Sequence, residues 1–329
     1  MAVFRPGEAA ERSYPSKLLA MQLYPIETGF FKLDGGAMFG VVPKTLWSKI
    51  HPADENNLCT WAMRCLLIQE GNKLILVDNG IGDKQDAKFF GHYYLHGDDT
   101  LDKSLAKHGF HRDDITDVLL THLHFDHCGG SIVRAGDKLL PAFKNATYWS
   151  HSRHWKWATE PNDREKASFL RENILPIQES GQLQFVDQPA DADLGSPTAF
   201  ATGDALPTGA TWSGGSLETI SHVILPGLSV RLASGHTESM MLPQLQYKGR
   251  TLVFMADLLP SAGHVPLPWI MGYDMFPLTT LQEKKAFWEE AATGEYVLML
   301  EHDPVNECCV LQPSEKGVKV GQIHRLVDL

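Results

Sequence analysis

The sequence predicts a layered α/β fold, and two observations support this. Apolar runs of strand length, such as residues 74–78 and 117–120, are separated by a helix-like segment at 100–108. The 329 residues are 43% hydrophobic and 21% charged, which provides an ample core for a soluble protein. Because strand, helix and strand follow one another in this order, we expect helices layered on sheets.

The first half of the chain opens with residues 1–21, whose mixed polarity predicts an N-terminal arm. A single domain is then expected over 22–329. Asp34-Gly35 is a natural turn between the first two predicted strands. The elements expected in this half are strands at 23–31, 36–42, 61–68, 74–78, 117–120 and 146–149, and helices at 100–108 and 151–175.

The second half repeats this organisation after a long loop insertion near 187–216, which is rich in Gly, Ala, Thr, Pro and Asp. A loop of this length in a compact domain is usually functional or mobile. A capping-box pattern that starts at Thr280 predicts a helix through about residue 292. The strands expected in this half are 228–233, 250–256 and 296–300.

The most unusual stretch is Thr121-His122-Leu123-His124-Phe125-Asp126-His127, which follows the strand at 117–120. Three imidazoles and a carboxylate this close together are costly to bury unless each has a partner. His122 and His124 are two residues apart, as side chains on one face of a strand end would be. Nitrogen ligands with a carboxylate suit zinc, manganese, iron or cobalt, so we predict a metal site here.

Three further residues that can ligate a metal follow predicted strands of the second half. They are His236, Asp257 and His302. In layered α/β folds, sites are built from loops at strand ends, where side chains from several strands converge. Each residue alone would be an ordinary polar group, but their recurrence predicts that they share one site with His122 and its neighbours.

Composition narrows the function and the location. The net charge of −11 speaks against an electrostatic nucleic-acid binder, so a small-molecule substrate is expected and nucleic acid is not. No membrane span is expected, because no apolar run reaches about 18 residues. The five cysteines form no C-x-x-C pair, and the first residues lack the apolar core of a signal peptide. Both observations favour the cytoplasm.

The motif resembles H-x-H-x-D-H, the hallmark of the metallo-β-lactamase superfamily. The resemblance extends over roughly residues 22–305 and implies a four-layer αβ/βα sandwich with a site at one edge, between two sheets. It is specific for the superfamily but not for a substrate. The residues that carry it are His122, His124, Asp126, His127, Asp78 at the end of its strand, Gly235-His236-Thr237, Asp257 and His302.

The resemblance further implies a binuclear centre of two divalent metal ions, most simply zinc, with manganese, iron or cobalt as alternatives. One ion would be held by His122, His124 and His236. The other would be held by Asp126, His127 and His302, and Asp257 would bridge the two. Such a centre can activate a bridging hydroxide for hydrolysis. Asp126 and Asp257 are the expected catalytic carboxylates, with Asp126 as the proton shuttle.

Two details distinguish the chain from the branch that it is similar to, the acyl-homoserine lactonases and methyl-parathion-type hydrolases. The lactonases place a tyrosine three residues after the bridging aspartate, where this chain has Pro260. The following loop offers Trp269 and Tyr273, which would wall an apolar pocket or pack under the loop. Asp78, which could be a simple turn residue, would by the resemblance orient the histidine loop.

We therefore expect a hydrolase of an ester-like bond, such as a lactone, carboxylic ester or phosphotriester, in a small and partly apolar substrate. The alternatives are an iron-dependent, persulfide dioxygenase-like oxidoreductase and a non-catalytic metal-binding protein. The sequence leaves open the substrate, the native metal and the oligomeric state, a homodimer included. It also leaves open whether the loop at 187–216 or the loop with Trp269 gates the site.

Overall fold

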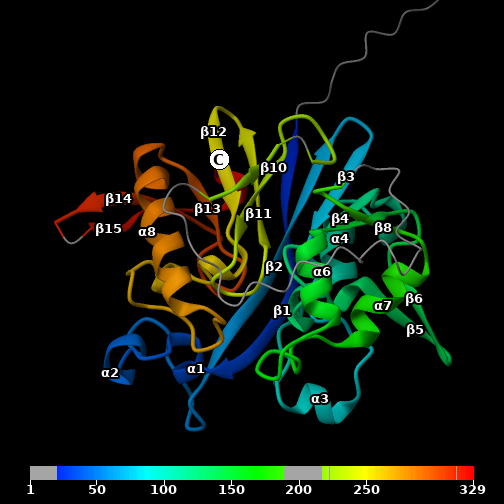
Figure 1. Ribbon diagram of the computed structural model, residues 1–329, viewed down its shortest axis with the longest axis horizontal. Helices are drawn as coiled ribbons and strands as arrows, with labels where there is room; N and C mark the ends of the chain where they lie inside the picture. The colour runs from blue at the N-terminus through cyan, green and yellow to red at the C-terminus, as the bar shows by residue number, and fades with distance from the viewer. Residues whose placement is uncertain (1–20, 189–216, 222, 316) are drawn as a thin grey trace, which may run out of the picture.

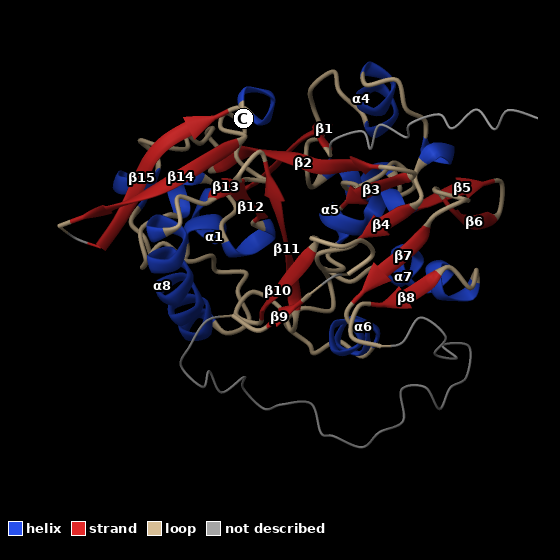
Figure 2. Ribbon diagram, turned by 90° about the horizontal axis from the view of Figure 1, so that it is seen from above, coloured by secondary structure: helices blue, strands red, loops and turns tan. Residues whose placement is uncertain are grey.

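The computed structural model describes residues 21–188, 217–221, 223–315 and 317–329. The expected arm, except Met21, and nearly all of the expected loop insertion lie outside the described residues. Two sheets occupy the centre of the molecule and helices lie on their outer sides, as Figures 1 and 2 show. This arrangement confirms the four-layer αβ/βα fold expected from the sequence.

The first sheet has six strands in the order β1-β2-β3-β4-β7-β8. β1, β2 and β3 are antiparallel, whereas β3, β4, β7 and β8 are parallel, so the carboxyl ends of β3 and β4 lie side by side. A separate ribbon consists of β5 (Ile132–Ala135) and β6 (Lys138–Pro141). The strands of the sheet are β1 (Gln22–Asp34), β2 (Leu58–Glu70), β3 (Lys73–Val77), β4 (Asp117–Leu119), β7 (Thr147–Ser150) and β8 (Leu183–Phe185).

The second sheet has seven strands in the order β15-β14-β13-β12-β11-β10-β9. Its central pair, β12 and β13, is parallel, so these two strands also end at one edge. The other pairs are antiparallel. The strands are β9 (Thr219–Ile220), β10 (Ser229–Ala233), β11 (Met240–Tyr247), β12 (Arg250–Phe254), β13 (Val297–Met299), β14 (Cys308–Ser314) and β15 (Gly317–His324).

Apolar side chains form the layers between these elements. One core joins the sheets and includes Val77 and Leu119 from the first and Leu232 and Phe254 from the second, all buried. A second core lies between the first sheet and α4, α6 and α7. None of the helices in the described part of the chain has the length and apolarity needed to cross a bilayer. The α-helices are α1 (Gly35–Phe39), α2 (Lys44–Trp47), α3 (Ala87–Gly91), α4 (Leu101–Lys107), α5 (Phe125–Cys128), α6 (Ser152–Thr159), α7 (Arg171–Glu179) and α8 (Pro277–Thr293).

Two predictions of secondary structure in the first half were wrong. The expected strand at 36–42 is replaced by α1, because the Asp34 side chain caps this helix by accepting a hydrogen bond from the Ala37 amide at 2.8 Å. The expected helix at 151–175 is broken into α6 and α7. The connecting segment at 160–170 carries side chains that reach the site.

The predicted start of the last helix was also wrong. α8 begins at Pro277, three residues before Thr280, with proline in its first turn. Glu283 does not complete a capping box. Its carboxylate instead accepts hydrogen bonds from the backbone amides of Ser234 and Gly235, at 2.6 and 3.1 Å. This contact fixes the end of β10 against α8.

Candidate metal centre

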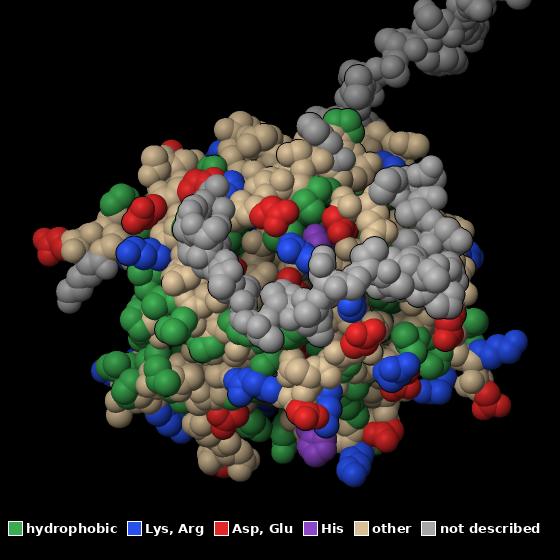
Figure 3. Space-filling model, in the orientation of Figure 1, with side chains coloured by type: hydrophobic (Ala, Val, Ile, Leu, Met, Phe, Trp, Pro, Cys, Tyr) green, Lys and Arg blue, Asp and Glu red, His purple; other side chains and the backbone are tan. Residues whose placement is uncertain are grey.

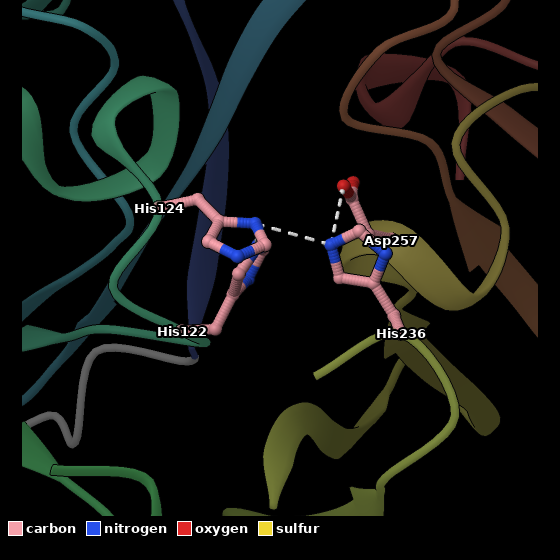
Figure 4. A group of neighbouring side chains, drawn as sticks. All are labelled: His122, His124, His236 and Asp257. Carbon is pink, nitrogen blue, oxygen red and sulfur yellow. Dashed lines mark hydrogen bonds and ion pairs between the residues drawn. The ribbon is translucent and has the colours of Figure 1, made fainter. Parts of the chain in front are cut away.

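The seven predicted ligands lie together between the two sheets. Figure 4 shows His122 and His124 reaching from the first half toward His236 and Asp257 from the second. The ligand atoms fall into two groups, within each of which the atoms lie within 4.8 Å of one another. The first group is His122, His124 and His236, with Asp257 beside them, and the second group is Asp126, His127 and His302.

Strand ends place these side chains. β4 delivers His122 and His124, and the short helix α5 that follows carries Asp126 and His127. In the second sheet, the ends of β10, β12 and β13 are followed by His236, Asp257 and His302. The convergence expected from the sequence is therefore found at the common edge of the two sheets.

In the first group, each histidine has a partner at the ring nitrogen that points away from the centre. Because a partner faces that nitrogen, the other ring nitrogen of each histidine is the one that faces the centre and could ligate a metal. The three contacts are His122 Nδ1 to Thr121 Oγ1 at 3.1 Å, His124 Nε2 to Glu165 Oε1 at 2.9 Å and His236 Nδ1 to Asp274 Oδ1 at 2.9 Å.

The inner nitrogens of the first group face one another. His124 Nδ1 lies 3.1 Å from His122 Nε2 and 3.2 Å from His236 Nε2. A cation between these three nitrogens would accept a lone pair from each ring. Ring nitrogens that ligate one tetrahedral zinc ion are separated by about 3.3 Å, given Zn–N bonds of about 2.05 Å. The geometry of the first group therefore fits such an ion.

The second group shows the same orientation of its rings. His302 Nδ1 donates to the carbonyl oxygen of Ala62 at 2.8 Å, so its Nε2 is the nitrogen that faces the centre. This atom lies 3.1 Å from His127 Nε2. Asp126 Oδ2 lies farther away, 3.8 Å from His127 Nε2 and 3.9 Å from His302 Nε2. These three residues can hold a second cation.

Asp257 faces both groups. Its Oδ2 lies 3.1 Å from His236 Nε2, whereas its Oδ1 lies 3.0 Å from His302 Nε2 and 3.6 Å from His127 Nε2. Oδ1 is buried and accepts no hydrogen bond from the described residues. The histidines around it hold the pKa of this carboxyl well below its usual range, against the opposing effect of burial. A buried carboxylate in this position suits a bridge between two cations.

Asp78 contacts both ligand groups, one of them through Thr121. Its Oδ1 accepts the Thr121 amide at 2.8 Å, and its Oδ2 accepts the Thr121 hydroxyl at 2.6 Å and lies 3.2 Å from His127 Nδ1. Thr121 in turn contacts His122. Asp78 adopts a positive φ of 55°, which turns the chain sharply after β3. One carboxylate thus orients a histidine of each group.

A glycine pair lets the motif approach the loop after β3. A Cβ at Gly129 would collide with the backbone of Ile81, and a Cβ at Gly130 would collide with the carbonyl oxygen of Asn79. The Gly130 amide donates to Gly80 at 2.9 Å in the same contact. The two glycines therefore allow α5 to lie directly against the strand end that carries Asp78.

Several residues that position the candidate ligands were not predicted from the sequence. Burial alone would raise the pKa of Glu165, but hydrogen bonds from His124 and other donors lower it to about 2, so this carboxylate is charged. Glu301, next to His302, lies 3.0 Å from His127 Nδ1, and burial raises its pKa to about 8. Only Glu301 left a signal, because a glutamate directly follows an apolar strand there.

His154 is a further residue that was missed. Its Nε2 accepts the Leu123 amide at 2.8 Å, between the two histidines of the motif, and its Nδ1 donates to the Glu238 carbonyl at 2.6 Å. Burial lowers the pKa of His154 to about 3, so the ring is neutral as these two contacts require. It ties the H-x-H segment to the turn after His236.

A cavity of about 370 Å³ opens over the centre, and its wall includes His124, Asp126, His236, Asp257 and His302. Tyr273 lines it, as one of the two expected pocket aromatics. Trp269 does not, which agrees with the alternative that it packs under the loop. Its ring packs edge-on against Phe39 with a centroid distance of 5.7 Å, because the loop folds it inward.

Comparison with known proteins defines the class. The model of the metallo-beta-lactamase superfamily matches residues 64–292, and the chain belongs to this superfamily. This membership confirms the family and the fold class expected from the sequence, as well as the expectation of a hydrolase. No curated protein matches the chain in sequence.

Several solved structures are similar to this chain in fold. A probable metal-dependent hydrolase from Staphylococcus aureus is 25% identical with a TM-score of 0.74, and the match covers 93% of this chain and 97% of that one. AidC, a dizinc quorum-quenching lactonase, is 21% identical with a TM-score of 0.67, covering 94% and 96%. The hydrolase AbOPH is 19% identical with a TM-score of 0.67, covering 93% and 95%. The last two matches bear on the fold alone.

Proposed function

We propose that the protein is a metal-dependent hydrolase of an ester-like bond, namely a lactone, carboxylic ester or phosphotriester, in a small and partly apolar substrate. The observation that supports this most directly is the set of five histidines whose ring nitrogens gather around Asp257, three of which line a cavity together with this carboxylate. The description of AidC as a dizinc lactonase agrees with this proposal.

We infer two divalent ions, with zinc first among the candidates for a set of imidazole and carboxylate ligands. His122, His124 and His236 would hold one, and Asp126, His127 and His302 the other. Asp257 would bridge them. Their contribution when bound is to acidify a shared water and to polarise the oxygen that gains charge in the reaction.

The protein's own groups would complete the chemistry. Asp126 lies on the cavity wall, so its carboxylate can take a proton from the attacking water and return it to the leaving oxygen. The outer partners Glu165, Asp274 and Asp78 keep the imidazoles in one tautomer, as the site requires. Side chains such as Met38 and Phe125 make part of the wall apolar and limit the access of further water.

The distribution of charged side chains on one face of the molecule agrees with a small-molecule substrate. On the face shown in Figure 3, lysines and arginines are interspersed with acidic side chains, and the described residues there form no continuous basic area. Cytoplasmic location and a single domain over 22–329 stay predictions.

Metal analysis of the purified protein, combined with a panel of a lactone, a carboxylic ester and a phosphotriester, tests the proposal. We expect two metal ions per chain under metal-replete conditions and turnover of at least one ester class. His124→Ala should abolish turnover while the circular dichroism spectrum stays folded. Fewer than two ions together with no hydrolysis across the panel would contradict the proposal.

A further inference from the structure

Among the described residues that line the cavity over the centre, Arg164 is the one lysine or arginine. The acidic side chains of this wall are all engaged elsewhere. Asp126 and Asp257 face the histidines, and Glu165 accepts hydrogen bonds from His124 and Trp157 at 2.9 and 2.6 Å. Arg164 is therefore a charge in the wall that the metal centre does not use.

The structure holds Arg164 in place from two sides. Asn162 Oδ1 accepts the backbone amides of Arg164 and Glu165 at 2.9 and 3.0 Å, which fixes the turn that also positions His124. The guanidinium donates through Nη2 to the carbonyl oxygen of Gly272, on the loop that also lines the cavity. The charge is thus tied to two loops at the rim of the cavity.

No carboxylate within the described ranges forms an ion pair with Arg164. The neighbouring cation behaves differently: Lys166 pairs with Asp163 at 2.8 Å and does not line the cavity. A guanidinium with most of its N–H groups still available can bind a carboxylate through two parallel hydrogen bonds. The position of Arg164 therefore favours an anion brought by the substrate.

The space between the centre and Arg164 is largely apolar. Leu33, Met38, Phe125, Met271 and Met275 contribute to its wall. A cavity of about 370 Å³ lies in the size range of small-molecule sites. A molecule that fits would place a polar reacting group at the histidines, an apolar body along the methionines and a charged end at the rim.

We propose that the substrate is an ester-like molecule whose apolar part ends in a carboxylate, and that Arg164 binds this carboxylate and selects for it. This inference rests on the proposed hydrolase function. Arg164 acts here in specificity and not in bond cleavage, because it does not belong to either ligand group.

Matched substrates test the inference on the zinc-loaded protein. The pair is two esters with the same apolar chain, one ending in a carboxylate and the other in the uncharged primary amide. We expect kcat/KM to favour the carboxylate, and Arg164→Gln to lower that preference about tenfold, as befits a partly exposed charge-assisted hydrogen bond. Lys166→Gln removes the same charge from the same loop and should leave the preference unchanged. Arg164→Lys should restore part of it, and added salt should weaken it.

A second readout separates this inference from the proposed function. Two hydroxamates that bind zinc, with the same pair of chain ends, are compared by their Kd. If the esters are turned over but Arg164→Gln leaves the preference unchanged, the anion site is wrong and the hydrolase stands. If neither ester is turned over, the panel of substrates tests the hydrolase proposal and the hydroxamates test the anion site: tighter binding of the charged member, lost in Arg164→Gln, supports the anion site, and equal binding overturns it.

Discussion

The two ligand groups of the centre differ in how the protein supports them. In the first group, each of two histidines has a carboxylate of its own, Glu165 and Asp274, and both carboxylates come from connecting segments outside the sheets. In the second group, the outer nitrogen of His302 contacts only a backbone carbonyl. The outer nitrogen of His127 lies near two carboxylates, Asp78 and Glu301, and each of them follows a strand of one of the two sheets. The first group therefore depends on loops, and the second on the sandwich itself.

This difference teaches where the site can vary. A cation bound by the second group is supported by strand ends that also form the core of the fold. A cation bound by the first group is supported by segments whose other side chains, such as Arg164 and Tyr273, line the cavity. Substitutions that alter substrate preference therefore lie close to the supports of the first group, and the two properties are coupled there.

Removing the shared carboxylate gives the largest expected effect. Asp257→Ala deletes the oxygens that face both groups, so metal should be lost from both and kcat/KM should fall by more than the 10- to 100-fold typical of losing an outer partner. Metal content by mass spectrometry and initial rates measure this. Retention of two ions per chain in this variant would refute the bridging role.

Glu165→Gln should separate the two groups. Among the histidines, it weakens the acceptor of His124 Nε2 only. The affinity for the cation of the first group should therefore fall about 10- to 100-fold, while the affinity for the cation of the second group is unaffected. A chelator competition that resolves two binding steps measures both constants. Glu172→Gln, in the same region but paired with Arg134 at the surface, is the matched control. An equal loss at both steps would contradict the division into loop-supported and sheet-supported groups.

Thr121→Val tests the link between the groups. It removes the hydroxyl between His122 and Asp78 but leaves the direct contact of Asp78 with His127. Since a neutral hydrogen bond contributes about 1 kcal/mol, we expect the affinity of the first cation to fall about fivefold. Thr121→Ser, which keeps the hydroxyl, should behave like the natural protein in the same titration. A larger effect on the second cation would reverse the assignment.

The last prediction concerns the pH dependence of stability, through a support at longer range. The buried ammonium of Lys284 donates to the carbonyls of His264 and Trp269, in the loop that leads to Asp274. Burial lowers its pKa from 10.5 to about 7. Between these values the unfolded chain binds one proton more than the folded chain, so stability rises with pH, by at most about 1.4 kcal/mol per unit.

Lys284→Met removes this dependence. The difference in the free energy of unfolding between the natural protein and this variant should therefore increase in favour of the natural protein from pH 7 to pH 9, in urea titrations. The exposed neighbour provides the comparison, because Lys285→Met should give a difference that does not change with pH. A flat profile for both variants would show that the pKa of Lys284 is not lowered in the folded protein.

The sequence predicted β1 to β4, β7, β10, β12 and β13 and the convergence of the candidate ligands. It did not predict β5, β6, β8, β9, β11, β14 and β15 or the side chains that support the candidate ligands. His236, Asp257 and His302 were predictable because each follows an apolar strand, and strand ends meet in a layered fold. Glu165 was not, because the segment 151–175 reads as one helix and only tertiary contacts break it at 160–170. Asp274 likewise lies in a loop with no periodicity.

Predictions from local sequence motifs failed where a side chain contacts residues that are distant in the sequence. The capping-box pattern at Thr280 and Glu283 describes a helix start, but Glu283 binds backbone amides 49 and 48 residues away instead. Trp269 was expected either at the pocket or under the loop, and the sequence could not decide between them because Trp269 packs against Phe39, from an element predicted to be a strand. Such pairings depend on the three-dimensional path of the chain.

The inward-facing nitrogens of the histidines have a thermodynamic consequence. A fold that brings these atoms to 3.1–3.2 Å of one another presents them together to cations, whereas the unfolded chain does not. Metal binding and folding are therefore linked by mass action, and each tenfold rise in free metal above the dissociation constant adds about 1.4 kcal/mol per site to the stability of the folded state. The supply of metal would then set not only the activity of this protein but also how long it persists.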